Sequence, residues 1–165
     1  MTDLRRAAVA VAAIGSLLAA TACSGQGGRL SKERYIERAG QICAEANKKI
    51  RRLPHPDLAD PDATSRTVRR LLAIQHGEVE DLRALRPPEV DEPTTRKWLG
   101  LVNKALDEAE SALAALQRGD RDGVNQANSR GGRAQLEADD LARGYGITGC
   151  VAASQQTPPT SASTP

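Results

Sequence analysis

Residues 93 to 119, PTTRKWLGLVNKALDEAESALAALQRG, contain the clearest helical pattern of the chain. Apolar residues recur there every three or four positions, which is the spacing of one face of an α-helix. The segment opens at a proline, which suits the first turn of a helix, and closes at Gly119, which suits the position just after one. We therefore predict a long amphipathic helix. Its apolar stripe consists of Trp98, Leu101, Val102, Ala105, Leu106, Ala109, Ala112, Leu113 and Leu116.

Two more helical patterns precede this segment. The first begins at Ser31, whose side chain suits an N-cap, and apolar residues follow at helical spacing until Pro54 stops the helix. The second opens at residues 62 to 64 and ends at the Pro87-Pro88 pair. Each pattern offers one apolar face, which a helix buries against its neighbours.

The fourth helical pattern opens at Asp120 or Asp122 and closes at the Gly-Tyr-Gly stretch of residues 144 to 146. Its weak point is the Gly131-Gly132 pair, because each glycine costs about 1 kcal/mol relative to alanine inside a helix. Two interpretations stay open, one continuous helix or two short helices with a break at the glycines. No segment alternates with a period of two for long enough to predict a β-strand.

These patterns predict an all-α domain at residues 31 to 151. Four amphipathic helices joined by short connections favour an up-down-up-down four-helix bundle. The core should be rich in alanine and leucine, and small residues should let the fourth helix approach its neighbours closely. These small residues are Ala127, Gly131, Ala134 and Ala138.

Residues 1 to 22 have the pattern of a signal peptide. A short basic region precedes an apolar stretch of 14 residues, which is too short to span a membrane. Small residues then lead to Cys23, as in the lipobox of bacterial lipoproteins, although Ala20 stands where that pattern usually has leucine. We expect a lipidated Cys23 to anchor the chain in the cell membrane, with residues 23 to 30 as a flexible tether. The alternative is an ordinary signal peptide that leaves Cys23 as a free thiol.

If Cys23 is lipidated, two cysteines remain, and an even number in an exported chain indicates a disulfide. The bundle supports a bond between Cys43 and Cys150, because the fourth helix ends near the start of the first. Residues 144 to 150 can therefore fold back far enough to reach Cys43. The last residues, 152 to 165, have no charged or large apolar side chain, so we expect a disordered tail.

The chain has only three aromatic side chains, Tyr35, Trp98 and Tyr145. The predicted topology places all three at one end of the bundle, the end nearest the tether. Two interpretations stay open. The rings pack together as a plug, or they form a small apolar pocket that faces the membrane.

Basic side chains gather at the opposite end of the predicted bundle. Such a surface could bind an anionic wall polymer or an acidic protein of the envelope. The default interpretation is a solvated face that keeps the protein soluble. We name these seven residues the basic surface: Lys48, Lys49, Arg51, Arg52, Arg66, Arg69 and Arg70.

The sequence lacks motifs for catalysis, metal binding or cofactor binding. Neither histidine has partners at zinc-ligand spacing, and His76 stands four residues before Glu80 as a solvated pair. Carboxylates cluster at residues 78 to 81, 107 to 110 and 137 to 140, on or beside polar helix faces, without the convergence that acid–base catalysis needs. We therefore expect no enzyme, no metal and no cofactor. A net charge of +2 also argues against a nucleic-acid partner.

Several short motifs follow one another in a distinctive order. These are Ile42-Cys43 followed by Asn47, then Leu53-Pro54, then Leu85-Arg86-Pro87-Pro88, and Tyr145-Gly146-Ile147 ahead of Cys150. In this order the chain resembles a group of small, Ala-rich helical lipoproteins and secreted proteins of high-GC Gram-positive bacteria. The resemblance covers residues 31 to 151 and implies a helical fold and an extracytoplasmic location. The group has no established activity, so the resemblance supplies no catalytic residues.

The sequence thus predicts a membrane-anchored, extracytoplasmic and non-enzymatic domain that interacts with another component of the cell envelope. One alternative is a carrier or sensor of a small apolar ligand at the aromatic end of the bundle. The other is an enzyme whose site is assembled from the scattered carboxylates.

Overall fold

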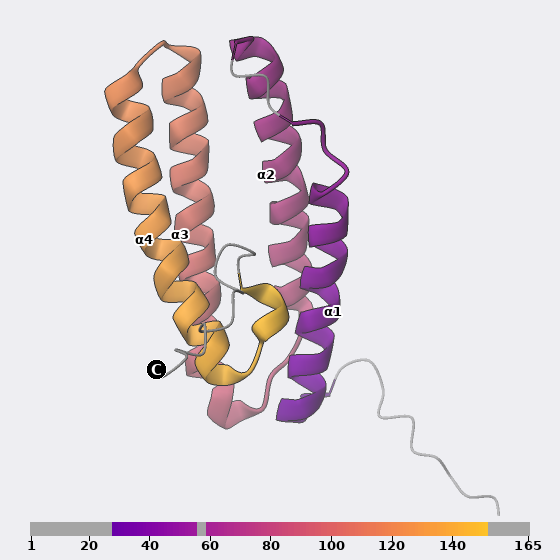
Figure 1. Cartoon of the computed structure of the whole chain (residues 1–165). Coiled ribbons are helices and arrows are strands. Elements are labelled where there is room, and N and C mark those ends of the chain that lie inside the picture. The colour runs from indigo at the N-terminus through magenta and orange to yellow at the C-terminus, as the bar shows by residue number, and fades with distance from the viewer. Residues whose placement is uncertain (1–27, 56–58, 152–165) are drawn as a thin grey trace, which may run out of the picture.

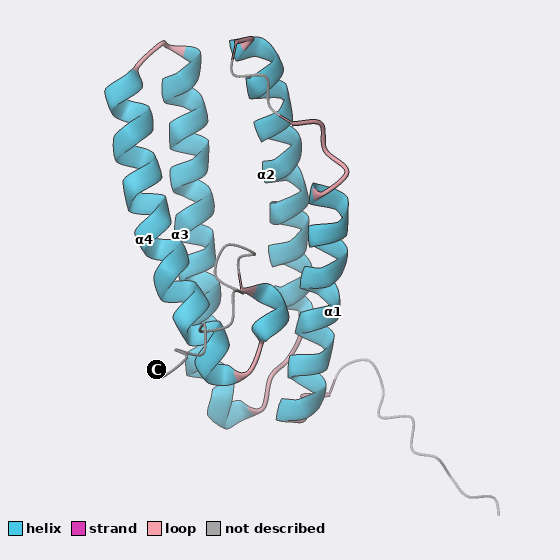
Figure 2. Cartoon of the chain, viewed as in Figure 1, coloured by secondary structure: helices cyan, strands magenta, loops and turns pink. Residues whose placement is uncertain are grey.

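The computed structural model describes residues 28–55 and 59–151, and these residues are all-helical, with no β-strand among them. Figures 1 and 2 show long helices joined by short connections. The predicted signal peptide, Cys23 and the C-terminal tail lie outside the described residues. The helices are α1 (Lys32–Ile50), α2 (Pro61–Ala84), α3 (Glu92–Gln117) and α4 (Arg121–Tyr145), and two short 3-10 helices are η1 (Glu89–Asp91) and η2 (Thr148–Cys150).

Capping side chains fix the starts of the helices. The Ser31 hydroxyl oxygen accepts a hydrogen bond from the backbone N–H of Arg34, as the sequence predicted for the start of α1. Helix α2 begins slightly earlier than predicted, because the Asp60 carboxylate accepts hydrogen bonds from the backbone N–H groups of Asp62 and Ala63. The local signals therefore place both helix starts to within a few residues.

Helices α3 and α4 form the most extensive contact between two elements. Helix α4 is continuous, so the alternative of a break at the glycine pair is wrong. A Cβ atom at Gly131 would lie 3.2 Å from the Cβ atom of Glu108 and 3.5 Å from the carbonyl oxygen of Ala105. A Cβ atom at Gly132 would meet nothing within 4 Å. Gly131 therefore allows the close approach of α4 to α3 that the small residues predicted.

The chain after α4 turns back and covers α1. Gly146 ends α4 with a φ of 105°, a left-handed conformation that glycine adopts readily. The η2 turn that follows contacts both α4 and α1, and Figure 1 shows it beside α1. A Cβ atom at Gly149 would lie 3.3 Å from the Cα atom of Gly40. The C-terminal turn is thus packed backbone against backbone on the first helix.

Buried apolar side chains form two clusters. The smaller cluster lies between α2 and α3 and consists of Leu72, Val79, Leu106 and Leu113. The larger cluster draws on all four helices and on the chain after α4. Its members are Tyr35, Ala39, Cys43, Leu82, Trp98, Ala138, Ala142, Tyr145, Ile147 and Val151. Four of these ten are small side chains, Ala39 and Cys43 from α1 and Ala138 and Ala142 from α4, so the cluster depends on close backbone approach.

Candidate functional site

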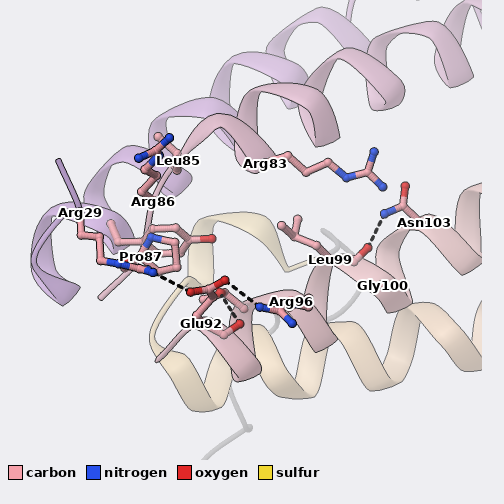
Figure 3. Close-up of a pocket in the computed structure, with 12 residues that line it drawn as sticks. Arg29, Arg83, Leu85, Arg86, Pro87, Glu92, Arg96, Leu99, Gly100 and Asn103 are labelled. Atoms are coloured by element: carbon pink, nitrogen blue, oxygen red, sulfur yellow. Dashed lines mark hydrogen bonds and ion pairs between the residues drawn. The ribbon is translucent and has the colours of Figure 1, made fainter. Parts of the chain in front are cut away.

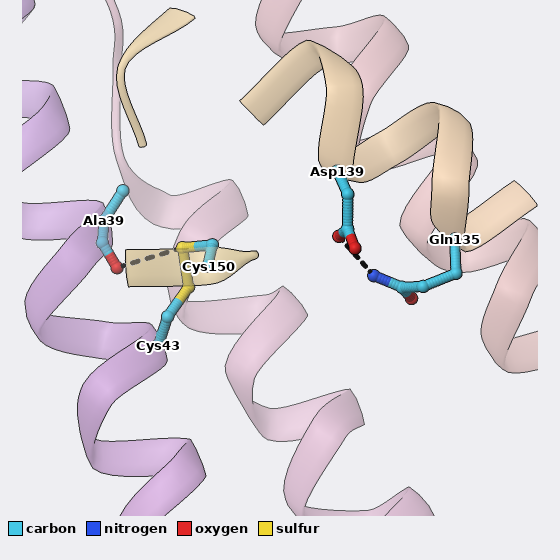
Figure 4. The surroundings of a disulfide bond; sticks show 5 residues. All are labelled: Ala39, Cys43, Gln135, Asp139 and Cys150. Atoms are coloured by element: carbon cyan, nitrogen blue, oxygen red, sulfur yellow. Dashed lines mark hydrogen bonds between the residues drawn. A yellow bond between two sulfur atoms is a disulfide. The ribbon is translucent and has the colours of Figure 1, made fainter. Parts of the chain in front are cut away.

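Cys43 of α1 and Cys150 of η2 are paired at disulfide distance, with Cα atoms 5.1 Å apart, as the sequence predicted (Figure 4). The Cys150 sulfur also lies 3.5 Å from the carbonyl oxygen of Ala39. The Cys43 side chain is fully buried. This bond joins two segments that are 107 residues apart in the sequence and holds the C-terminal turn against α1.

The carboxyl group of Glu78 lies beside this disulfide. One of its oxygens and the sulfur atoms of Cys43 and Cys150 all lie within 4.8 Å of one another. Burial raises the pKa of Glu78 to about 7. Although these three side chains are near enough to hold a metal ion, both sulfurs are used in the disulfide, so they offer no thiolate ligand.

Two carboxylates that the sequence placed on solvated faces are buried to different degrees. Glu78 is half-buried, in a groove of about 540 Å³ between α1 and α2. Asp139 is 1% exposed and accepts a hydrogen bond from the Gln135 amide at 2.8 Å (Figure 4). The expectation of solvated clusters is therefore wrong for these two residues and for Glu108, whose side chain is 17% exposed and paired with Arg130. His76 also differs from its expected pairing, because its Nε2 atom lies 2.8 Å from Glu110 of α3.

The three aromatic side chains come together near the start of α1, as predicted. The rings of Tyr35 and Tyr145 meet edge to face with centroids 5.9 Å apart, and the Lys32 amine lies 4.6 Å from the centre of the Tyr145 ring. The Tyr145 hydroxyl donates a hydrogen bond of 2.8 Å to Asp91, and burial followed by this bond raises the pKa of Tyr145. The buried Trp98 ring completes the group.

These rings leave no open space between them. The hollow lined by Trp98, Tyr145 and Ile147 is too small to admit a water molecule. The alternative of an apolar pocket built from Tyr35, Trp98 and Tyr145 finds no support at this hollow, because Trp98, Tyr145 and their neighbours fill the volume themselves. The interpretation as a plug is the one that fits this packing.

An open pocket of about 560 Å³ lies next to this plug, between the start of α1, the end of α2 and the start of α3. Figure 3 shows Arg83 and Asn103 toward one side of it and Arg29, Arg86 and Glu92 toward the other. We name it the arginine pocket. Its lining consists of Arg29, Tyr35, Arg83, Leu85, Arg86, Pro87, Glu92, Thr95, Arg96, Leu99, Gly100 and Asn103.

Glu92 is held between two arginines at one side of the arginine pocket. Arg29 contacts one of its carboxylate oxygens at 2.9 Å, and Arg96 contacts the other at 2.7 Å. Hydrogen bonds from Arg29 and Arg96 keep the pKa of Glu92 below its usual value. Arg29 also donates a hydrogen bond of 3.1 Å to the carbonyl oxygen of Pro87. These contacts fix the Arg29 and Arg96 side chains at the pocket wall.

Tyr35 forms part of the pocket lining and has an unsatisfied polar group. Its side chain is fully buried, and its hydroxyl has no hydrogen-bond partner among the described residues. The nearby Thr95 hydroxyl donates to the carbonyl oxygen of Glu92 at 3.1 Å. Burial raises the pKa of the Tyr35 hydroxyl, and Thr95 opposes this shift. Buried hydroxyls without a partner are uncommon in folded proteins.

All seven residues of the basic surface are exposed. Lys48 lies 3.7 Å from Glu45, and Arg66 lies 3.8 Å from Asp60, so acidic neighbours offset part of the charge. The basic surface thus resembles an ordinary solvated face. Cys23, the predicted lipid attachment point, lies outside the described residues.

Comparison with family models, with curated proteins and with solved structures found no match. Within the described ranges, no helix combines the length and the apolar character needed to cross a membrane. Function is therefore inferred from the residues of this chain alone.

Proposed function

We propose that the protein is an exported lipoprotein, held at the outer face of the cell membrane by lipid on Cys23. Its helical domain then serves as a non-enzymatic interaction module of the envelope. We also infer that the helices form an up-down-up-down bundle in which η2 fills the space beside α1. The proposal assigns no catalytic residue, metal or cofactor.

The observation that carries this proposal is the way the chain enters the domain. The backbone N–H of Leu30 donates a hydrogen bond of 2.7 Å to the carbonyl oxygen of Arg86. Together with the bond from Arg29 to Pro87, this attaches the chain to the connection between α2 and α3. A chain that is fixed just after a predicted tether suits a domain that must hold one orientation toward its anchor.

The short tether would keep this attachment close to the bilayer. The stretch from Ser24 to Arg29 has six residues, and a flexible chain of that length spans about 13 Å on average. The arginine pocket would therefore lie near the lipid headgroups, and the basic surface would face away from them. The first surface suits a membrane component, and the second suits a wall polymer or an acidic envelope protein.

Lipidation is tested by metabolic labelling with an alkyne-bearing fatty acid, followed by separation of membrane and soluble fractions. We expect label and membrane association for the natural chain, and loss of both in the Cys23→Ser variant. The Ser24→Ala variant is the matched control and should keep both. An unlabelled natural chain in the soluble fraction would show an ordinary signal peptide and contradict the anchor.

The interaction role is tested by crosslinking in intact cells and capture of the lipidated protein from its own membrane. We expect a specific envelope component that the natural chain retains. Its loss on charge reversal at Arg51, Arg52, Arg69 and Arg70 would assign it to the basic surface. Capture of the same components by an unrelated lipoprotein would contradict a specific interaction.

A further inference from the structure

We infer that the arginine pocket is a binding site for a phosphate group attached to an apolar moiety. This inference goes beyond the proposed function, because the pocket is built from described residues and would bind such a compound with or without lipid on Cys23. Four features of the pocket support this inference: its charge, its apolar wall, the Tyr35 hydroxyl in its lining and the open space at Gly100.

The charge of the pocket favours an anion. Its twelve lining residues include four arginines and a single carboxylate, that of Glu92. Glu92 is already shared by Arg29 and Arg96, whereas Arg83 makes no ion pair among the described residues. Guanidinium groups bind phosphate oxygens through paired, charge-assisted hydrogen bonds. A phosphate beside Arg83 would therefore meet a guanidinium group that forms no ion pair among the described residues, in a pocket with more arginines than carboxylates.

The walls of the pocket favour a ligand that is not a bare anion. Leu85, Pro87 and Leu99 line it together with the arginines. Ligand pockets of this mixed kind bury an apolar part of the ligand and use a few polar groups to fix its orientation. The shared chemistry is a phosphate ester with an apolar group, which a phospholipid headgroup region or a soluble phosphate compound can supply.

The Tyr35 hydroxyl offers a donor that nothing in the described residues uses. It lies under the pocket without a hydrogen bond of standard geometry, and its polar neighbour is the Thr95 hydroxyl, which donates to the carbonyl oxygen of Glu92 and lowers the pKa of Tyr35 against the effect of burial. A ligand oxygen that reached it would satisfy the hydroxyl. Removing the hydroxyl should therefore weaken ligand binding without weakening the fold, which separates this role from a purely structural one.

Gly100 provides a way to close the pocket without damaging the helix. It lies within α3 and lines the pocket, and a Cβ atom there would meet nothing within 4 Å. Leucine has a much higher helix propensity than glycine. The Gly100→Leu variant should therefore fold at least as well as the natural chain, with its side chain occupying the pocket. Gly132→Leu is the matched control, because Gly132 is also helical and unobstructed.

The test uses the full mature chain from residue 23 with Cys23→Ser, so that no lipid is attached. Binding is followed by the fluorescence of Trp98, the single tryptophan, and by the rise in Tm. The probes are inorganic phosphate, micelle-free dihexanoyl phosphatidylglycerol, and vesicles of phosphatidylglycerol or of phosphatidylcholine. Binding to the soluble probes identifies a free phosphate compound as a sufficient ligand. Binding to phosphatidylglycerol vesicles alone identifies a membrane headgroup.

We expect at least one phosphate probe to bind, with affinity that falls as salt is raised. Affinity should fall about tenfold or more in Gly100→Leu and in the Arg83→Gln, Arg86→Gln double variant. Tyr35→Phe should weaken binding while its ligand-free Tm is unchanged or higher. Gly132→Leu and the distant Arg121→Gln should bind as the natural chain does. No binding of any probe, or equal binding by Gly100→Leu, would overturn the inference.

Discussion

The carboxyl group of Glu78 lies half-buried between α1 and α2, close to the Cys43–Cys150 disulfide. Its sequence neighbours Glu80 and Asp81 are exposed on the same helix. Three of the four residues from 78 to 81 are acidic, so the sequence gives all three the same polar character, and only the packing of α1 against α2 separates Glu78 from the others. Its protonation is therefore a property of the fold.

The free energy of unfolding should depend on pH because of Glu78. Burial raises its pKa in the folded chain from 4.5 to about 7, so the folded state holds a proton that the unfolded state releases. The stabilising contribution is full below about pH 4.5 and is lost as the pH rises through 7. We expect urea unfolding to show a decline on the order of 1–3 kcal/mol across this window, the lower values allowing for partial exposure.

The Glu78→Gln variant should remove this decline and be more stable than the natural chain at pH 8. Glu80→Gln is the matched control, because Glu80 is exposed on the same helix. It should leave the pH profile unchanged. The same slope in Glu78→Gln and in the natural chain would contradict the assignment.

Helix α4 illustrates what can be predicted for a whole element. Its length and its caps follow from local signals, namely Asp120 at the start and Gly146 at the end. Its continuity through Gly131 and Gly132 does not follow from local signals, because two glycines in a row weaken any helix prediction. The contact with α3 decides the outcome, and it is made by only one of the two glycines.

Alanine at each of these two glycines should therefore have a different effect. Both substitutions gain about 1 kcal/mol of helix propensity. Gly132→Ala should keep that gain, whereas Gly131→Ala should lose part or all of it, because its Cβ atom would press on Glu108 at 3.2 Å. Denaturant unfolding of the two variants measures the difference. Equal stabilisation by both would show that α4 can shift away from α3 at no cost.

The arginine pocket could not be predicted from the patterns of the individual helices. Its residues on α3 recur at 92, 95, 96, 99, 100 and 103, which is one helical face. That face mixes charged, polar and apolar side chains, so it gives no clear amphipathic signal. The remaining arginines come from the segment before α1, from the last turn of α2 and from the connection after it, and only the tertiary fold brings them to this face.

For the whole molecule, the Cys43–Cys150 bond is the longest-range covalent constraint among the described residues. The pair could be predicted because the expected export and lipidation leave two cysteines, and the expected helix lengths bring residue 150 within reach of Cys43. The close contact of Gly149 with Gly40 could not be predicted, since a single glycine in a sequence does not indicate which segment packs against it. The sequence also did not decide between an aromatic plug and an apolar pocket, because that outcome depends on how the three rings pack.

Loss of the disulfide should destabilise the whole fold. For a loop of about 100 residues the chain-entropy estimate is about 4.7 kcal/mol, which is an upper figure. We expect the Cys43→Ala, Cys150→Ala double variant to unfold at clearly lower urea concentration than the oxidised natural chain. The reduced natural chain should behave like the variant. Equal midpoints for all three would show that η2 stays on α1 through packing alone.

The attachment of Arg29 and Leu30 to the α2–α3 connection also has a mechanical consequence. Tension applied to the chain at its N-terminal side would act first on the Leu30–Arg86 hydrogen bond and on the Arg29–Glu92 ion pair. Helix α1 lies behind these contacts and would be shielded until they break. If Cys23 carries the proposed lipid anchor, a pull on it would act on the rim of the arginine pocket before it reached the core.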